Sequence, residues 1–256
     1  MDKNTIEEEE PENIKNEDWR LQAITTLAKE FRGPSGHVSP IGSPVIQMGQ
    51  VHFDGNVLGF GLPNTTALYL NLSHKFFLES QVYVQSDFYK KNNPKEPMIY
   101  AKSDLEIFDY LEKRIASIVF AFTALESFVN QRVPDDFVYE VERKDKKCVE
   151  KYNKIQIEKF LNLDVKLGEV LPLVMKILSP RGKTAWNGYT KLKKIRDRLI
   201  HIKTRDTNSH GVDDDSVWHE LLDKKSPNFA KQAKEIIEYF HPSGGFRPRW
   251  LKKIPF

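Results

Sequence analysis

The stretch that decides the fold is Lys191-Leu-Lys-Lys-Ile-Arg-Asp-Arg-Leu-Ile-His201. It lies inside a run from Lys183 to Arg205 that predicts one helix. At 3.6 residues per turn, one row of apolar positions shares a face, as in a helix packed on a core: Leu192, Ile195, Leu199 and Ile202. A second row follows another face: Trp186, Tyr189, Lys193, Asp197 and Ile200. Two partly apolar faces predict two contacts, one with the protomer core and one with a partner.

Three polar residues of this run are candidate catalytic groups. Arg196 and His201 flank the second face, about 140° apart around the helix axis. Asp197 precedes His201 by four residues, so its carboxylate can orient the imidazole and favour the imidazolium, from a starting pKa near 6.5. An exposed pair of this kind stabilises a helix by only about 0.2–0.5 kcal/mol. The pair therefore matters for catalysis more than for stability. The alternative to a catalytic site is an ordinary basic helix with a solvated ion pair.

An Arg-Asp pair followed after three residues by His, on a late helix of a mainly α domain, resembles the motif of the HEPN superfamily. The apolar residues around Arg196 and His201 fit that motif, and so does the upstream helix that ends Ala124-Leu-Glu-Ser-Phe-Val-Asn130. The resemblance covers about residues 101–241. The same spacing recurs at Arg32 and His37 and at Arg205 and His210, but both of these pairs lie in loop-like sequence.

The resemblance implies a HEPN-like helical bundle that acts as a metal-independent endoribonuclease, without a cofactor, in a homodimer whose motif helices meet at the interface. Arg196, Asp197 and His201 would be catalytic, and Glu126 and Asn130 would support them. Glu126 would pair with Arg196, although a capping or surface glutamate fits the sequence equally well. Some members of the superfamily have lost catalysis, so a dimeric scaffold that binds RNA or a protein partner is the alternative.

The resemblance leaves three settings open, a toxin–antitoxin pair, phage defence or a housekeeping role, and a regulated member of the superfamily would have a neutralising protein partner. In members regulated by nucleotide transfer, a Tyr usually follows the His by two residues. Here that position is Lys203. Control by tyrosine modification at this position is therefore not expected, and a neutralising partner would act in another way.

The charge distribution favours a polyanionic partner. Net charge is only +3, but residues 1–18 contain eight acidic and two basic residues, whereas residues 181–206 contain nine basic and two acidic ones. A basic patch that coincides with the candidate site is typical of an RNA-binding surface. We expect phosphate contacts from four basic residues around the motif: Lys193, Lys194, Arg198 and Lys203.

Composition excludes several classes of protein. No apolar run approaches eighteen residues, which argues against a membrane span, and the acidic N-terminus is unlike a secretory signal. We therefore expect a cytoplasmic protein. The single cysteine, Cys148, excludes an intrachain disulfide and a cysteine zinc site, and the histidines show no metal-ligand spacing.

The first hundred residues predict a tail and a small mixed α/β accessory segment. Residues 1–18 read as a disordered acidic tail, and residues 19–100 as the accessory segment, which opens with a helix from Asp18 to Phe31. Asp54-Gly55 predicts a hairpin between Val45–Phe53 and Val57–Phe60. The run Thr65–Tyr89 is ambiguous between helix and strand.

Residues 101–241 predict the main helical domain. A capping box at Ser103–Glu106 opens a long helix that stops at Pro134, with a seven-residue seam: Phe108, Leu111, Ile115, Ile118, Phe122, Leu125 and Val129. Residues 134–148 read as a charged loop, followed by helices over about 149–162 and 164–178 and by a short helix around Val217–Leu222.

The last predicted helix follows Ser226-Pro227 and carries an apolar stripe: Phe229, Ala233, Ile236, Ile237 and Phe240. The basic aromatic tail, residues 242–256, fits two roles equally well. It can stack on bases and contact phosphates, or it can pack against the protein as a strap.

Overall fold

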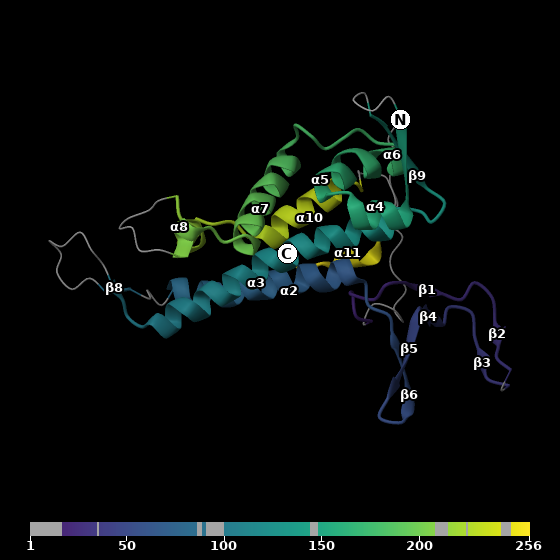
Figure 1. The fold of residues 1–256 in the computed structure, drawn as a ribbon. Helices are drawn as coiled ribbons and strands as arrows, with labels where there is room; N and C mark the ends of the chain where they lie inside the picture. Colours follow the sequence, from purple (N-terminus) through teal and green to yellow (C-terminus); the bar gives the residue numbers. More distant parts are fainter. Residues whose placement is uncertain are drawn as a thin grey trace, which may run out of the picture. The chain divides into compact units, whose positions relative to one another are not determined.

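The computed structural model describes residues 17–34, 36–85, 89–90, 100–143, 148–207, 215–223, 225–241 and 247–256. Within these ranges the chain is mainly α, with small two-stranded sheets (Figure 1). It divides into two compact units, one formed by residues 1–68 and 243–255 and the other by residues 69–242 with Phe256. None of the helices in the described ranges has the length and apolarity needed to cross a membrane.

The first unit is built from short antiparallel pairs. β1 pairs with β4, β2 with β3, and β5 with β6, and the C-terminal segment adds α11. The bounds of these elements are β1 Ile24–Thr26, β2 Phe31–Arg32, β3 Val38–Ser39, β4 Pro44–Ile46, β5 Met48–Phe53, β6 Asn56–Gly61 and α11 Arg249–Lys253. The β5–β6 hairpin turns at Asp54 and Gly55, both with positive φ, so the predicted hairpin is confirmed.

The predicted helix from Asp18 to Phe31 is wrong. This stretch contains β1 instead, and Asp18 accepts hydrogen bonds from the backbone and side chain of Arg20 in a turn. The apolar spacing fitted a helix, but Ile24-Thr25-Thr26 is β-branched throughout and finds a strand partner in β4. Tertiary pairing therefore overrides the local 3.6-residue pattern.

The C-terminal tail contributes buried side chains. Trp250 and Leu251 on α11 are buried, and Arg249 donates hydrogen bonds to the backbone carbonyls of Glu17 and Asp18 in the same unit. For the described residues 247–256, this packing agrees with the strap alternative. The first part of the tail and residues 1–16 of the acidic segment lie outside the described residues.

The second unit holds the longer helices. Its elements are α2 Thr65–Gln85 from Tyr69 onward, β7 Tyr89–Lys90, β8 Tyr100–Ala101, α3 Asp104–Arg132, β9 Val138–Arg143, β10 Cys148–Asn153, α4 Lys154–Phe160, α5 Leu163–Val165, the π-helical turn η1 Lys166–Val170, α6 Leu171–Met175, α7 Thr184–Ile200, α8 Thr204–Thr207, α9 Val217–Leu222 and α10 Phe229–Tyr239. The domain boundary was predicted near residue 100. The division between the units instead lies within α2, after Leu68.

Helix α3 is the central element of the second unit. It packs against α2, where Phe120 stacks on Tyr69 and Phe76, and against α7 and α10 (Figure 1). The ambiguous run from Thr65 is thus a helix as far as Gln85. The predicted seam is buried only in its C-terminal half, from Ile118 to Val129, whereas Phe108 is exposed and Leu111 and Ile115 are half-buried.

The segment after α3 differs from its prediction. Val138–Arg143 and Cys148–Asn153, expected in a charged loop and at the start of a helix, pair instead as the antiparallel strands β9 and β10, and helix α4 begins only at Lys154. Asn153 caps α4 with a complete capping box, so the helix start is encoded locally. The predicted helix 164–178 is a chain of shorter pieces, because η1 widens the backbone around Gly168 and Lys176 ends α6 with positive φ.

The motif helix α7 is shorter than predicted. It runs from Thr184 to Ile200, and His201 ends it with non-helical backbone angles. Leu192 and Ile195 are buried as expected, whereas Ile202 is exposed beyond the helix end. The stripe on α10 is fully buried and packs on α3 and α7, so that prediction is confirmed.

Candidate functional site: the basic face of helix α7

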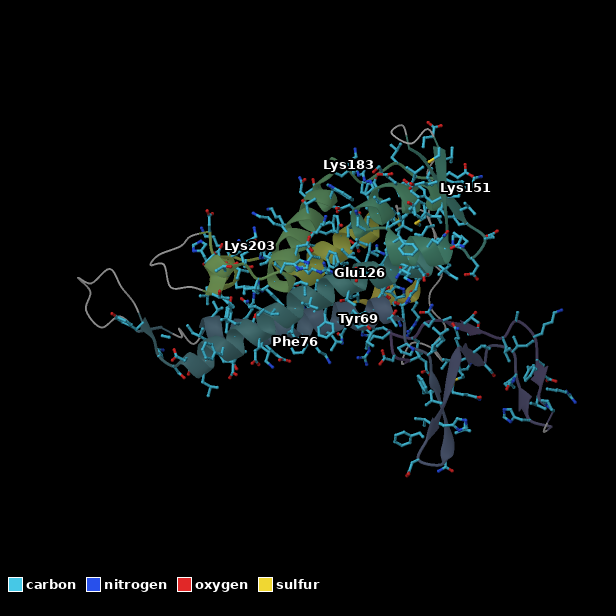
Figure 2. The ribbon with its side chains drawn as sticks, viewed as in Figure 1. Tyr69, Phe76, Glu126, Lys151, Lys183 and Lys203 are labelled. Carbon is cyan, nitrogen blue, oxygen red and sulfur yellow. The ribbon has the colours of Figure 1, made fainter. Side chains whose placement is uncertain are left out.

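Arg196 lies on the side of α7 that faces α3. Its guanidinium carbon is 4.0 Å from the centroid of the Phe122 ring, a cation–π distance. Its two terminal nitrogens pair with carboxylates, Nη1 with Asp197 at 2.8 Å and Nη2 with Glu126 at 3.9 Å. Glu126 extends from α3 (Figure 2), so its predicted pairing with Arg196 is present. The arrangement fixes the guanidinium at the surface, with its side chain 27 % exposed.

His201 lies at the C-terminal end of α7 with an exposed side chain. Its backbone N–H still donates to the carbonyl of Asp197 at 3.0 Å. The carboxylate of Asp197 binds Arg196, however, and makes no hydrogen bond to the imidazole in the described part of the chain. The expected orienting contact between Asp197 and His201 is therefore replaced by a contact between Asp197 and Arg196. His201 stands near these groups as an accessible imidazole.

Asn130 does not reach Arg196. Its side-chain oxygen instead accepts a hydrogen bond from the ammonium of Lys166 at 3.3 Å, and the backbone carbonyl of Glu158 accepts another at 2.8 Å. Lys166 is buried in η1, and burial lowers its pKa, while the nearby carboxylate of Glu126 acts in the opposite direction. Asn130 therefore stabilises the buried ammonium of Lys166.

The four predicted phosphate ligands differ in availability. Lys194 is exposed on α7, and Lys203 is exposed between α7 and α8 (Figure 2). Lys193 donates to the carboxylate of Asp164. Arg198 is held internally, because its guanidinium binds the buried carboxylate of Asp206 at 3.2 Å and the carboxylate of Glu220 at 3.5 Å. Arg198 thus belongs to the framework rather than to the free cationic surface.

A hollow of about 520 Å³ opens beside α7. Asp197 lies on its wall and joins it to the motif. The lining residues are Asp164, Arg181, Trp186, Thr190, Lys193, Lys194 and Asp197. Three cations and two carboxylates give this lining a net positive charge.

The wall of the hollow is braced by hydrogen bonds from other elements. Tyr189 donates its hydroxyl to Asp164 at 2.6 Å, and burial together with this hydrogen bond raises the pKa of Tyr189. Arg181 binds Glu169 at 2.7 Å and lies 5.8 Å from the centroid of the Trp186 ring. Glu169 also accepts from Tyr139, and these partners lower its pKa.

Helical spacing predicts which residues share the α7 side of this hollow, but not the residues on its other side. Trp186, Lys193 and Asp197 were placed on a common face by helical spacing, and Thr190 and Lys194 lie beside them on α7. Asp164 and Arg181 come from α5 and from the segment before α7, and no spacing rule links these positions to the motif. Only the fold brings them together.

No model of a known protein family matches this sequence. The search of curated proteins and the search of solved structures likewise find no match.

Proposed function

We propose that this protein is a metal-independent endoribonuclease of the HEPN type, with Arg196 and His201 as its catalytic residues. The observation that carries the proposal is the exposed imidazole of His201 at the end of a basic helix, five residues after a surface guanidinium held by Asp197 and Glu126. The cationic hollow beside Asp197 supports the same function, because a concavity whose lining has a net positive charge suits a phosphate chain.

The proposed reaction needs the ribose 2′-hydroxyl. His201 removes its proton as general base, the 2′-oxygen attacks the adjacent phosphorus, and the bond to the 5′-oxygen breaks. The leaving 5′-oxygen takes up a proton from an imidazolium, and the products are a 2′,3′-cyclic phosphate and a 5′-hydroxyl. Arg196 stabilises the negative charge that develops on the phosphate oxygens. DNA lacks the attacking hydroxyl, so it is not a substrate.

The proposal includes a homodimer through the C-terminal end of α7. Ile200 and Ile202 leave 55 % and 42 % of their surfaces exposed beside His201, which supports an apolar contact there. A two-fold axis near these residues would bring a second His201 close to the first. One imidazole would then act as the base while the other acts as the acid.

A non-catalytic RNA-binding module is the second candidate, and a specific observation favours it. The guanidinium of Arg196 is already shared by two carboxylates, which weakens its attraction for a phosphate. In the described part of the chain, moreover, the His201 ring has no hydrogen-bonded carboxylate to fix its tautomer. Binding without cleavage would be the activity of such a module.

Cleavage of single-stranded RNA in the presence of EDTA distinguishes the two candidates. The wild type should cut and leave cyclic phosphate ends, and His201→Ala should lose about 10²–10⁴-fold of the rate, the usual contribution of acid–base catalysis. Arg205→Ala and His210→Ala are the controls, because this pair shares the Arg-to-His spacing outside the motif, and both variants should leave cleavage nearly unchanged. Equal cutting of a substrate with one 2′-deoxy sugar at the cut site would exclude the mechanism. RNA binding that never leads to cleavage would assign the scaffold role.

A further inference from the structure

We infer that the hollow on α7 is a nucleotide-binding subsite, in which a base of single-stranded RNA stacks beside Trp186 and its phosphate contacts Lys194. This inference rests on the proposed function, because it names the part of the substrate next to the scissile bond. Trp186 is half-buried in the wall, and the Arg181 guanidinium is 5.8 Å from its ring centroid. An indole and a guanidinium are the two flat groups on which proteins stack unpaired bases.

The stacking surface is rigid before any ligand binds. The Trp186 ring lies 4.9 Å from the Tyr189 ring, and Tyr189 is fixed by its hydrogen bond to Asp164. Arg181 is held at its far end by Glu169. Side chains that are already ordered lose little conformational entropy on binding, so a single nucleotide can be held by few contacts.

The charges of the hollow divide into a bound set and a free one. Lys193 is neutralised by Asp164, and Arg181 by Glu169. Lys194 is exposed on the rim and makes no ion pair or hydrogen bond within the part of the chain that the structure describes. A phosphate that enters the hollow therefore meets one unpaired ammonium and would compete with Asp164 for a second.

The hollow lies next to the proposed cleavage site, so a base bound in it belongs to a nucleotide near the scissile phosphate. Asp197 lines the hollow and binds Arg196, so the two sites share a carboxylate. The hollow lies toward the N-terminus of α7, and His201 lies one turn beyond Asp197 at the other end. A strand that runs along α7 would place one nucleotide in the hollow while the neighbouring phosphate reaches Arg196. The subsite would thereby set which phosphate is cut.

Binding of a single-stranded 2′-O-methyl RNA of about ten nucleotides, within the usual site size of single-strand binders, tests the subsite without cleavage. Trp186→Leu should raise the dissociation constant roughly 5- to 150-fold, the usual range for one lost stacking contact. Lys194→Ala should reduce the salt dependence of log K by about 0.7, as expected for one single-strand phosphate contact. Lys191→Ala, the same charge change on the same helix outside the lining, is the matched control and should change the dissociation constant much less.

Trp186→Phe controls for the possibility that Trp186→Leu weakens binding by disturbing the fold, because Phe retains an aromatic ring beside Tyr189. It should bind RNA nearly as well as the wild type while removing the part of the tryptophan fluorescence that RNA quenches. Two results would overturn the subsite. One is a Trp186→Leu variant whose dissociation constant and RNA-dependent fluorescence quenching equal those of the wild type. The other is the same salt dependence of log K in Lys194→Ala and Lys191→Ala. If the wild type cleaves RNA and Trp186→Leu cleaves it with an unchanged KM, the subsite fails and the nuclease stands. Tryptophan-dependent binding without cleavage would leave the subsite standing and remove the nuclease.

Discussion

At the scale of single residues, the imidazole of His74 is a titratable group that contacts the N-cap residue of helix α10. Its Nδ1 accepts a hydrogen bond from the side-chain amide of Asn228 at 2.9 Å, and its ring stacks on Phe256 with 4.0 Å between centroids. Asn228 also caps α10 through its side-chain oxygen. Burial, with a smaller effect from the charge of Lys231, lowers the pKa of His74 below its ordinary value of 6.5.

This lowered pKa predicts a loss of stability in mild acid. The folded state holds fewer protons at His74 than the unfolded state, so its contribution is complete above pH 6.5 and is lost as pH falls toward the folded pKa. Thermal unfolding at pH 8 and pH 5.5 should show a smaller pH effect in His74→Gln than in the wild type. His201→Gln, a change at an exposed ring, should retain the wild-type dependence. The same pH effect in both variants would contradict this assignment.

Asp206 is the residue whose loss should destabilise the motif region most. Its buried carboxylate binds Arg198 at 3.2 Å and accepts from the backbone N–H of Val217 at 2.8 Å. Asp206→Ala leaves a mostly buried guanidinium without its main partner, which should lower the free energy of unfolding by about 3–5 kcal/mol. Glu220→Gln removes the more exposed partner of the same arginine and should cost at most about 1 kcal/mol. Urea unfolding measures both, and equal losses would contradict the asymmetry.

At the scale of elements, the turn η1 positions one wall of the hollow. A Cβ on Gly168 would lie 2.5 Å from Nε of Arg181, so Gly168→Ala must displace that side chain. The ion pair between Arg181 and Glu169 is exposed, so the loss of this ion pair should change the free energy of unfolding by at most about 1 kcal/mol. RNA affinity should fall several-fold, because the guanidinium leaves its place beside Trp186. In a double-mutant cycle with Arg181→Ala, the two losses should not add. If the two losses of RNA affinity add fully, Gly168→Ala does not act through Arg181.

At the scale of the whole molecule, the proposed dimer makes catalysis depend on protein concentration. Ile200→Asp places a charge in the expected contact and should yield monomers in sedimentation experiments, with loss of cleavage. Binding of 2′-O-methyl RNA should persist, because Ile200 lies outside the lining of the hollow. Lys191→Asp, an exposed change on the same helix, should leave the dimer intact. A wild-type protein that cleaves as a monomer would exclude the two-fold arrangement.

Much of the architecture follows from local sequence. The long apolar seam of α3, the Asp54-Gly55 turn and the stripe on α10 each encode their element by spacing or turn chemistry alone. The resemblance also offered Glu126 as a partner of Arg196, with a capping or surface glutamate fitting equally well, and the structure brings the two groups to 3.9 Å. Predictions failed where a local pattern competed with strand pairing, as at Ile24–Thr26 and at Cys148–Asn153.

By itself the sequence determined a mainly α chain with a basic helix that carries Arg196, Asp197 and His201, because periodicity and charge are local properties. Only the tertiary structure decided that Asp197 binds Arg196 instead of His201, that Arg198 is held by Asp206, and that Asp164 and Arg181 complete a hollow beside Trp186. These contacts join residues from different elements, or choose among several partners within reach. Such choices depend on packing in three dimensions, which no single stretch of the chain encodes.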